Sequence, residues 1–239
     1  YMDGRDLLFG NAPRYSAESL TFRVRLMSGT LAILLALLVF LTAQEMFGLG
    51  AGFLALVLLT FEPNVLAHGA FVATDAGVCC FFVASVYAFY RYCKAPSVGR
   101  LAVAGLAAGL ALATKHSAVL LLPMLVLLAG GEVAFRFSGE AQGKRALRML
   151  GALAAIGVVA VAVLWVFYGF RYNARPDGLR LDPSLAQYVM PLRPMEAKGI
   201  LCLARFHILP ESYRDGLADV RNMANGRPSY FFGKVYAHG

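Results

Sequence analysis

The chain is organised around one polar stretch, Glu62-Pro63-Asn64-Val65-Leu66-Ala67-His68-Gly69-Ala70-Phe71-Val72-Ala73-Thr74-Asp75, which joins two strongly apolar segments. Charged and polar side chains are costly in hydrocarbon and are rarely placed there without a task. Pro63 and Gly69 favour a polar turn that ends one membrane helix and begins the next. Asp75 allows two interpretations, because an uncharged run starts at Ala76. Its carboxylate either caps the following helix, as the helix dipole favours, or carries out a function.

The composition places this chain in a membrane. Its 239 residues are 59% hydrophobic and only 15% charged, and the mean hydropathy is +0.63. A soluble domain of this size needs far more polar surface. We therefore predict an all-α fold, a polytopic membrane helix bundle with six crossings. The corresponding uncharged runs are Leu26–Gln44, Met46–Phe61, Ala76–Tyr90, Leu101–Thr114, 118–131 and Met149–Phe170.

The fourth and fifth crossings are separated at Lys115. A single helix over residues 101–131 would be about 46 Å long, which exceeds a hydrocarbon core of about 30 Å. Two short spans hinged at Lys115 fit better. The segment Leu101–Thr114 is rich in glycine and alanine. Small residues let helices approach closely in lipid, so we expect this segment to pack inside the bundle.

Charged residues predict the orientation of the bundle. Two basic loops lie two crossings apart, and their basic residues are Arg91, Lys94 and Arg100 in one and Arg136, Lys144, Arg145 and Arg148 in the other. The positive-inside tendency makes both loops cytoplasmic. The polar stretch Glu62–Asp75, the pair Lys115-His116 and everything after Phe170 then share the outer face. Four arginines that flank spans on this outer face favour the opposite orientation: Arg23, Arg25, Arg171 and Arg175.

The predicted organisation has three parts: the end of an extracytoplasmic loop (1–25), a six-helix transmembrane region (26–170) and an extracytoplasmic segment truncated before a further membrane helix (171–239). Within the last part, Tyr213, Leu217 and Val220 share one helical face and predict a short amphipathic helix. We expect an aromatic-rich loop over Arg227–Gly233.

The net charge and the positions of the cysteines indicate which partners and sites the sequence favours. The net charge of +8 suits contact with anionic lipids or phosphate groups. Nucleic acid is a poor partner, because the basic residues flank apolar segments instead of forming one stripe with exposed aromatic side chains. The four cysteines form no disulfide or metal framework, since two are adjacent inside an apolar run and the others stand apart.

Several motifs, taken in order along the chain, resemble a known family. They are Pro63-Asn64-Val65-Leu66-Ala67-His68-Gly69 running into Ala73-Thr74-Asp75, the run Gly105–Lys115, and in the tail Leu209-Pro210, Tyr213, Gly216-Leu217 and Pro228–Gly233. Together they resemble the lipid-carrier-dependent glycosyltransferases of the protein-mannosyltransferase and aminoarabinose-transferase type, which have the GT-C membrane fold. The resemblance covers most of the chain from about Arg25 onward.

This resemblance implies transfer of a sugar, mannose-like or related, from a polyprenyl-phosphate donor to a protein or lipid acceptor. The reaction is expected on the extracytoplasmic face, in the inner membrane of a bacterium. The family uses a catalytic acid in the first outer loop, between its first and second membrane helices. If Leu26–Gln44 is the second helix, we expect that acid to precede Tyr1. Asp3 and Asp6 match no pattern of that loop.

The resemblance gives the polar residues that remain a chemical task. A glycosyl phosphate leaving group gains negative charge as its bond breaks, so a fixed cation nearby stabilises the transition state. We expect Lys115 to bind the phosphate, with Arg171 and Arg175 behind it. The alternative for Lys115 is snorkelling to the membrane interface. Asp75 is the candidate catalytic residue of this chain, and could hold an acceptor, a metal ion or a lysine.

Two histidines complete the candidate site. The nearest partners expected for Asp75 across the bundle are Lys115 and His116. His68 and His116 are candidates for substrate binding, and with Asp75 they could ligate a divalent metal ion, the one cofactor that we leave open. Lone histidines at membrane interfaces are more often hydrogen-bonding anchors.

Two other classes of function stay open from the sequence. A transporter or flippase-like bundle also places polar residues at span ends, although here the charges gather at one face and none lies in the middle of a span. A structural membrane subunit would use its outer tail to dock a partner.

Overall fold

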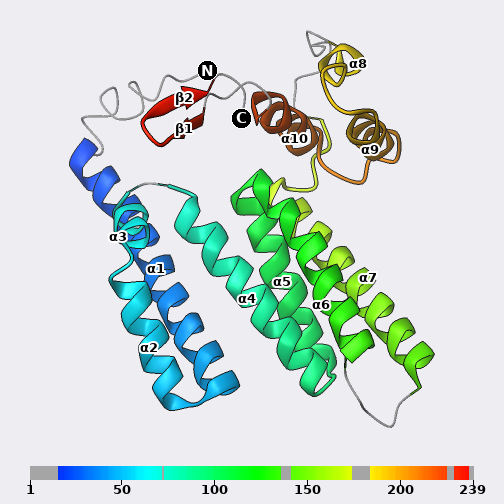
Figure 1. The fold of residues 1–239 in the computed structure, drawn as a ribbon. Coiled ribbons are helices and arrows are strands. Elements are labelled where there is room, and N and C mark those ends of the chain that lie inside the picture. The colour runs from blue at the N-terminus through cyan, green and yellow to red at the C-terminus, as the bar shows by residue number, and fades with distance from the viewer. Residues whose placement is uncertain (1–15, 72, 136–140, 174–183, 225–228, 237–239) are drawn as a thin grey trace. The chain divides into compact units, whose positions relative to one another are not determined.

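The structure of the chain is a computed structural model that describes residues 16–71, 73–135, 141–173, 184–224 and 229–236. It divides into two compact units, residues 1–160 and 161–239, and each is described here by itself. The first unit contains the apolar helices and the second contains the tail (Figure 1).

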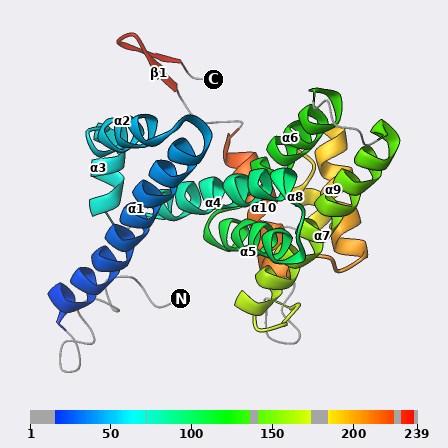
Figure 2. The same ribbon diagram turned by 90° about the horizontal axis from the view of Figure 1, so that it is seen from below.

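The first unit begins with a helical hairpin. Helix α1 (Ala17–Phe47) starts after Ser16, whose hydroxyl accepts a hydrogen bond from the Ser19 amide, and ends at Gly48. Gly48 has a φ of 95°, a backbone conformation that favours glycine, and lets the chain reverse into α2 (Leu49–Thr60). The two helices lie side by side (Figure 1, Figure 2).

The polar stretch after α2 contains a short helix, α3 (Pro63–Ala70). Proline suits the first turn of a helix, and the Glu62 carboxylate accepts a hydrogen bond of 2.7 Å from the Val65 amide, so the local sequence starts a helix here. The helix is bent by 65° from α2. The interpretation of this stretch as a turn is therefore wrong for Pro63–Ala70.

Four further helices and one 3-10 helix complete the first unit: α4 (Asp75–Lys94), α5 (Val98–Thr114), η2 (His116–Leu120), α6 (Leu121–Phe135) and α7 (Gln142–Phe167), whose end belongs to the second unit. Helix α4 lies between the α1–α2 hairpin and the group formed by α5, α6 and α7 (Figure 1, Figure 2). The break between α5 and α6 falls at Lys115, where the sequence predicts a hinge.

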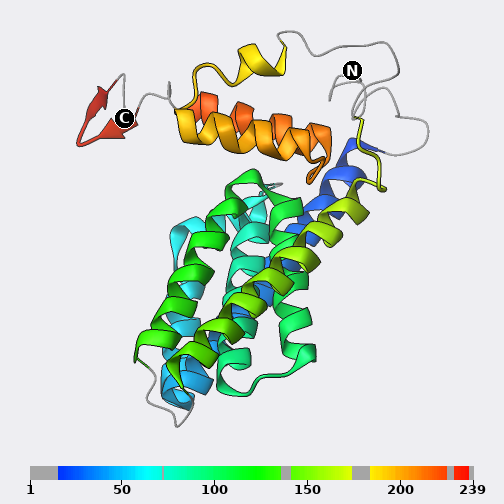
Figure 3. The same cartoon turned by 90° about the vertical axis from the view of Figure 1, so that its right-hand side faces the viewer.

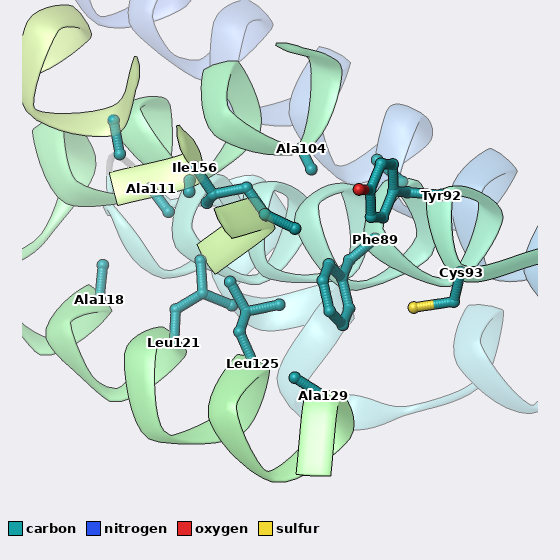
Figure 4. Packing of buried hydrophobic residues seen from close by; sticks show 14 of the residues in the cluster. Phe89, Tyr92, Cys93, Ala104, Ala111, Ala118, Leu121, Leu125, Ala129 and Ile156 are labelled. Carbon is teal, nitrogen blue, oxygen red and sulfur yellow. The ribbon is translucent and has the colours of Figure 1, made fainter. Parts of the chain in front are cut away.

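The core of the first unit is an apolar cluster shared by α4, α5, η2, α6 and α7 (Figure 4). Phe89 fills its centre, and Leu121, Leu125 and Ile156 approach it from the other helices. The six buried residues of helix α5 are all alanine or glycine, which confirms its expected place inside the bundle. Small side chains allow the close helix approach that stabilises bundles in lipid.

The number of membrane spans is only partly established. Among the described residues, four helices are long and apolar enough to cross a membrane: α1, α4, η2 with α6, and α7. The bent pair α2–α3 makes a fifth if it is one span, and α5 is apolar but shorter. The fold is thus a membrane helix bundle, and the count of six crossings stays a prediction.

The described basic residues of both predicted loops lie at one end of the bundle, because α4 and α6 run toward the same end and α5 and α7 return from it (Figure 1, Figure 3). At this end Glu45 of α1 accepts a hydrogen bond of 2.5 Å from Tyr87 and lies 3.6 Å from Arg91 and 3.7 Å from Lys94. The charge of Glu45 is thus matched by cations of α4. A charge at a helix end inside lipid is tolerated when it is paired.

The second unit packs short helices and a hairpin: α8 (Leu185–Tyr188), α9 (Pro194–Arg205), α10 (Glu211–Ala224), β1 (Ser229–Phe231) and β2 (Lys234–Tyr236). Helices α9 and α10 lie side by side (Figure 3) and are joined by an ion pair of 2.9 Å between Arg221 and Glu196. Tyr188 donates a hydrogen bond of 2.5 Å to Asp219. Burial and this hydrogen bond raise the pKa of Tyr188 to about 12.

The tail confirms one expectation and corrects another. The helix expected after Pro210 is α10, and Tyr213 on it is almost fully buried. The aromatic segment expected as a loop instead forms the antiparallel hairpin β1–β2, in which Tyr230 pairs with Val235. Aromatic and β-branched residues favour strands, and Gly233 with a φ of 79° supplies the turn, which the loop interpretation overlooked. Residues 227–228 lie outside the described part.

Candidate functional site

The candidate site lies where α4 begins and α5 ends. Asp75 is the first residue of α4, and Lys115 directly follows α5. The Lys115 ammonium donates a hydrogen bond to the Asp75 carboxylate. The two residues are forty positions apart in the sequence, so this contact depends entirely on how the helices pack.

A glycine lets the two helix ends approach. A Cβ added at Gly77 would lie 3.0 Å from the Thr114 methyl group and 3.4 Å from a Leu31 methyl group of α1. Most Cβ atoms in proteins keep a larger distance, so a side chain at this position would push α4 away from α5 and α1. Gly77 and Thr114 adjoin the site along the chain. The close crossing at Gly77 therefore places Asp75 within reach of Lys115.

The Asp75 carboxylate has a second neighbour, His68 of α3. The distance from His68 Nδ1 to Asp75 Oδ2 is 3.6 Å, and the two atoms attract when the imidazole is protonated. The residue that precedes α4 is Thr74, whose side chain makes no capping hydrogen bond. Asp75 thus benefits from the helix dipole in the first turn, but its carboxylate is bonded to Lys115. The interpretation of Asp75 as the cap residue itself is not what the structure shows.

The ion pair is open on one side. The side chain of Lys115 is 40% exposed and that of Asp75 39%. An ammonium group has three N–H donors, and among the described residues one of them bonds to Asp75. The exposed side of Lys115 can therefore donate to a ligand while the ion pair stays intact. This arrangement suits a phosphate, because a phosphate accepts several hydrogen bonds at once.

A cavity of about 110 Å³ adjoins the ion pair. It lies among α1, α3 and α4, and the residues that line it are Ala32, Leu35, Asn64, Val65, His68, Asp75, Ala76 and Cys79. The sequence singled out His68 and Asp75 of this set. Nothing in the sequence distinguishes the alanines and Leu35 as cavity residues, because they occur in long apolar runs whose members all look alike.

Of the other predicted site residues, the structure also describes His116 and Arg171. His116 follows Lys115 directly, begins η2 and is half-buried. Arg171 is exposed after the end of α7 and belongs to the second unit. Arg175 lies outside the described residues, as do Asp3 and Asp6. The structure thus brings together Asp75, Lys115 and His68 among the candidates.

The divalent metal ion that the sequence leaves open at Asp75 stays a prediction. Among the residues that the structure describes, no three histidine, cysteine, aspartate or glutamate side chains come together. Asp75 and His68 would offer two ligands, and the ammonium of Lys115 is bonded to the carboxylate that a cation would need. A divalent ion usually needs more ligands than these.

Comparison with known proteins gives the family. A family model described as dolichyl-phosphate-mannose-protein mannosyltransferase matches residues 17–167. The chain belongs to the dolichyl-phosphate-mannose-protein mannosyltransferase family. No curated protein and no solved structure matches the chain. The family match begins at the first residue of α1 and ends at the last residue of α7, so it contains the helix bundle with Asp75, Lys115 and the cavity.

Membership of this mannosyltransferase family confirms the resemblance seen in the sequence and makes the chain an integral membrane glycosyltransferase of the GT-C type. The tail motifs, which begin at Leu209, lie beyond the matched residues, so their resemblance stays a prediction. The roles of all the predicted site residues stay predictions as well, and Arg171 and Arg175 also lie beyond the matched residues. His68, Asp75, Lys115 and His116 lie within the match.

Proposed function

We propose that this glycosyltransferase moves a sugar from a polyprenyl-phosphate donor to a hydroxyl group of a protein or lipid acceptor, on the extracytoplasmic face of a bacterial inner membrane. The observation that carries the proposal is the half-exposed ion pair between Asp75 and Lys115 inside the region that matches the family. It offers a fixed cation at the end of the bundle opposite to the two basic loops, which the positive-inside tendency assigns to the cytoplasm.

Lys115 is proposed to bind the phosphate of the donor. In the transfer, the bond between the anomeric carbon of the sugar and the phosphate oxygen breaks, and its electron pair stays on the phosphate. The acceptor oxygen forms the new bond to the anomeric carbon and gives up its proton to a base that we leave unassigned. Because negative charge grows on the phosphate, the ammonium of Lys115 stabilises the transition state more than the ground state.

Asp75 is proposed to act through Lys115, as a positioning residue. A lysine side chain has four rotatable bonds, and fixing its ammonium before the donor arrives avoids reorganisation during the reaction. The hydrogen bond from Lys115 supplies this fixation. His68 is a second polar neighbour, 3.6 Å from the carboxylate, and its imidazole can form hydrogen bonds with hydroxyl groups of the acceptor or of the donor sugar.

The proposal is tested by transfer in proteoliposomes with a radiolabelled polyprenyl-phosphate sugar as the donor. The unmodified full-length protein should transfer label to an acceptor fraction. Lys115→Ala should lower kcat/KM for the donor about a hundredfold, the lower end of the loss seen when one preorganised hydrogen-bond donor is removed.

The matched control is Lys144→Ala, which removes an exposed lysine at the other end of the bundle. It should leave kcat/KM unchanged. Equal losses in the two variants, or transfer from a nucleotide sugar with no use of the polyprenyl-phosphate donor, would contradict the proposal.

A further inference from the structure

The end of helix α4 beside Glu45 gathers more positive than negative charge. Arg91 and Lys94, in the last turn of α4, lie 3.6 Å and 3.7 Å from the Glu45 carboxylate of α1. Arg100 follows in the first turn of α5, and its guanidinium donates hydrogen bonds of 3.0 Å and 2.7 Å to the carbonyls of Arg91 and Ala95. Three cations and one carboxylate therefore meet where α4 ends.

The two cations of α4 keep hydrogen-bond donors to offer. Their distances to Glu45, 3.6 Å and 3.7 Å, are longer than an ordinary N–H···O hydrogen bond. The Glu45 oxygen nearest to Arg91 accepts its hydrogen bond from Tyr87 instead. A guanidinium has five N–H donors and an ammonium has three, so donors of both remain for a further acceptor. The side chains of Arg91 and Lys94 are 47% and 51% exposed, so a ligand can reach these donors.

The position of these cations along α4 points to a lipid. Asp75 and Arg91, the charged residues at either end of the uncharged run of α4, are sixteen positions apart, or about 24 Å along a helix. The hydrocarbon core of a bilayer is about 30 Å thick, so this end of α4 stays close to the boundary between hydrocarbon and headgroups. Tyr87 and Tyr90, whose rings lie 5.7 Å and 5.1 Å from the two cations, are typical of that boundary. An anion at this depth is the phosphodiester of a phospholipid.

We propose that this end of α4 binds the headgroup of an anionic phospholipid, with the phosphodiester on Arg91 and Lys94. The phosphodiester oxygens accept charge-assisted hydrogen bonds, and a site with net positive charge attracts a lipid with net negative charge. A zwitterionic lipid binds less well, because it brings its own cation to a site that already has three. Asp75 lies at the opposite end of the same helix, so this site is separate from the one proposed for sugar transfer.

Native mass spectrometry of the full-length protein, titrated with dioctanoyl phosphatidylglycerol, tests this site. The Kd of the first bound lipid should be about tenfold lower than that of dioctanoyl phosphatidylcholine. Each basic residue near an anionic surface strengthens the attraction about fivefold, so Arg91→Gln combined with Lys94→Gln should raise the Kd for phosphatidylglycerol about thirtyfold. The matched control is Lys144→Gln combined with Lys198→Gln. It removes the same charge at two exposed positions elsewhere and should leave the Kd nearly unchanged.

Glu45→Gln distinguishes a lipid site from an ion pair that only stabilises the fold. It removes the negative charge and keeps both cations, so it should lower the Kd for phosphatidylglycerol about fivefold. If the cations served only to neutralise Glu45, this variant would lose stability and its Kd would stay the same or rise, which would refute the proposal. Where the double variant is unstable, adding Glu45→Gln removes the unpaired carboxylate, and this triple variant should still bind the lipid weakly.

Two further measurements exclude other anions and the donor site. Inorganic phosphate in large excess should not displace phosphatidylglycerol, because it has no acyl chains that hold it at the hydrocarbon boundary. Lys115→Ala should leave the lipid Kd unchanged, and the Arg91→Gln/Lys94→Gln variant should keep its donor kcat/KM. Equal affinity for the two phospholipids, an equal loss in the control variant, displacement by inorganic phosphate, or weaker lipid binding in Lys115→Ala would overturn the proposal. None of these outcomes bears on the proposed sugar transfer.

Discussion

The two partners of the ion pair, Asp75 and Lys115, can be substituted separately. The exposure of the pair limits its contribution to the free energy of unfolding. Both side chains are about two-fifths exposed, at 39% and 40%. Solvent screens such a pair, so its coupling energy in folding should be about 0.5–1 kcal/mol. For a protein of this size that corresponds to a shift in Tm of about 1–4 °C.

The effect on sugar transfer should be much larger. Lys115→Ala should lower kcat/KM for the donor about a hundredfold, or about 2.7 kcal/mol of transition-state stabilisation. Asp75→Asn should lower it less, because the lysine remains and only its fixation is lost. Since Asp75 acts through Lys115, the double variant should lose no more activity than Lys115→Ala alone. Asp75→Glu keeps a carboxylate and should recover part of the activity.

The assay measures both quantities on the same preparations. Donor kcat/KM comes from transfer in proteoliposomes, and Tm comes from a dye that reacts with the buried cysteines as the bundle opens. Losses that multiply in the double variant would show that Asp75 acts independently of Lys115. A loss of activity no larger than the loss of stability would leave Asp75 as a helix-end charge and nothing more.

Two further predictions concern packing and orientation. Gly105→Ala should destabilise the bundle by about 1–3 kcal/mol, because a Cβ there would lie 2.7 Å from Val159 Cβ. Gly157→Ala is the control, since a Cβ at that position would have nothing within 4 Å and should not destabilise the bundle. An equal Tm for both variants would contradict the close crossing of α5 and α7. A cysteine introduced at exposed Ala95, in the loop between α4 and α5, should react with an impermeant maleimide only from the cytoplasm, and the exposed Cys202 only from outside; the reverse pattern would invert the orientation. Cys93 cannot serve as the inner reporter because it is buried.

The sequence alone predicted the parts of this protein that depend on local chemistry. Long uncharged runs predicted a membrane helix bundle, since backbone N–H and C=O groups in lipid must form hydrogen bonds within the helix. The interruption at Lys115 gave the break between α5 and α6, because that charge ends an apolar run too long for one span. The family resemblance rested on motifs within or beside these runs, and the family match confirmed it.

Contacts between distant residues needed the tertiary structure. The sequence named Lys115 as a partner of Asp75 from their shared face, but the hydrogen bond itself exists because Gly77 lets α4 and α5 approach closely. The proximity of His68 follows from α3, a helix whose capping residue Glu62 looked like part of a polar turn.

The cavity is an example of a feature that could not be predicted from the sequence. Its walls are ordinary alanine, valine and leucine side chains from α1 and α3 with Ala76 and Cys79 of α4, which resemble every other apolar residue of the chain. An apolar run determines that a helix forms, because that depends on backbone hydrogen bonding and lipid contact within the run. Which face of the helix borders empty space depends on the shape of three helices packed together, and that is decided only when the chain has folded.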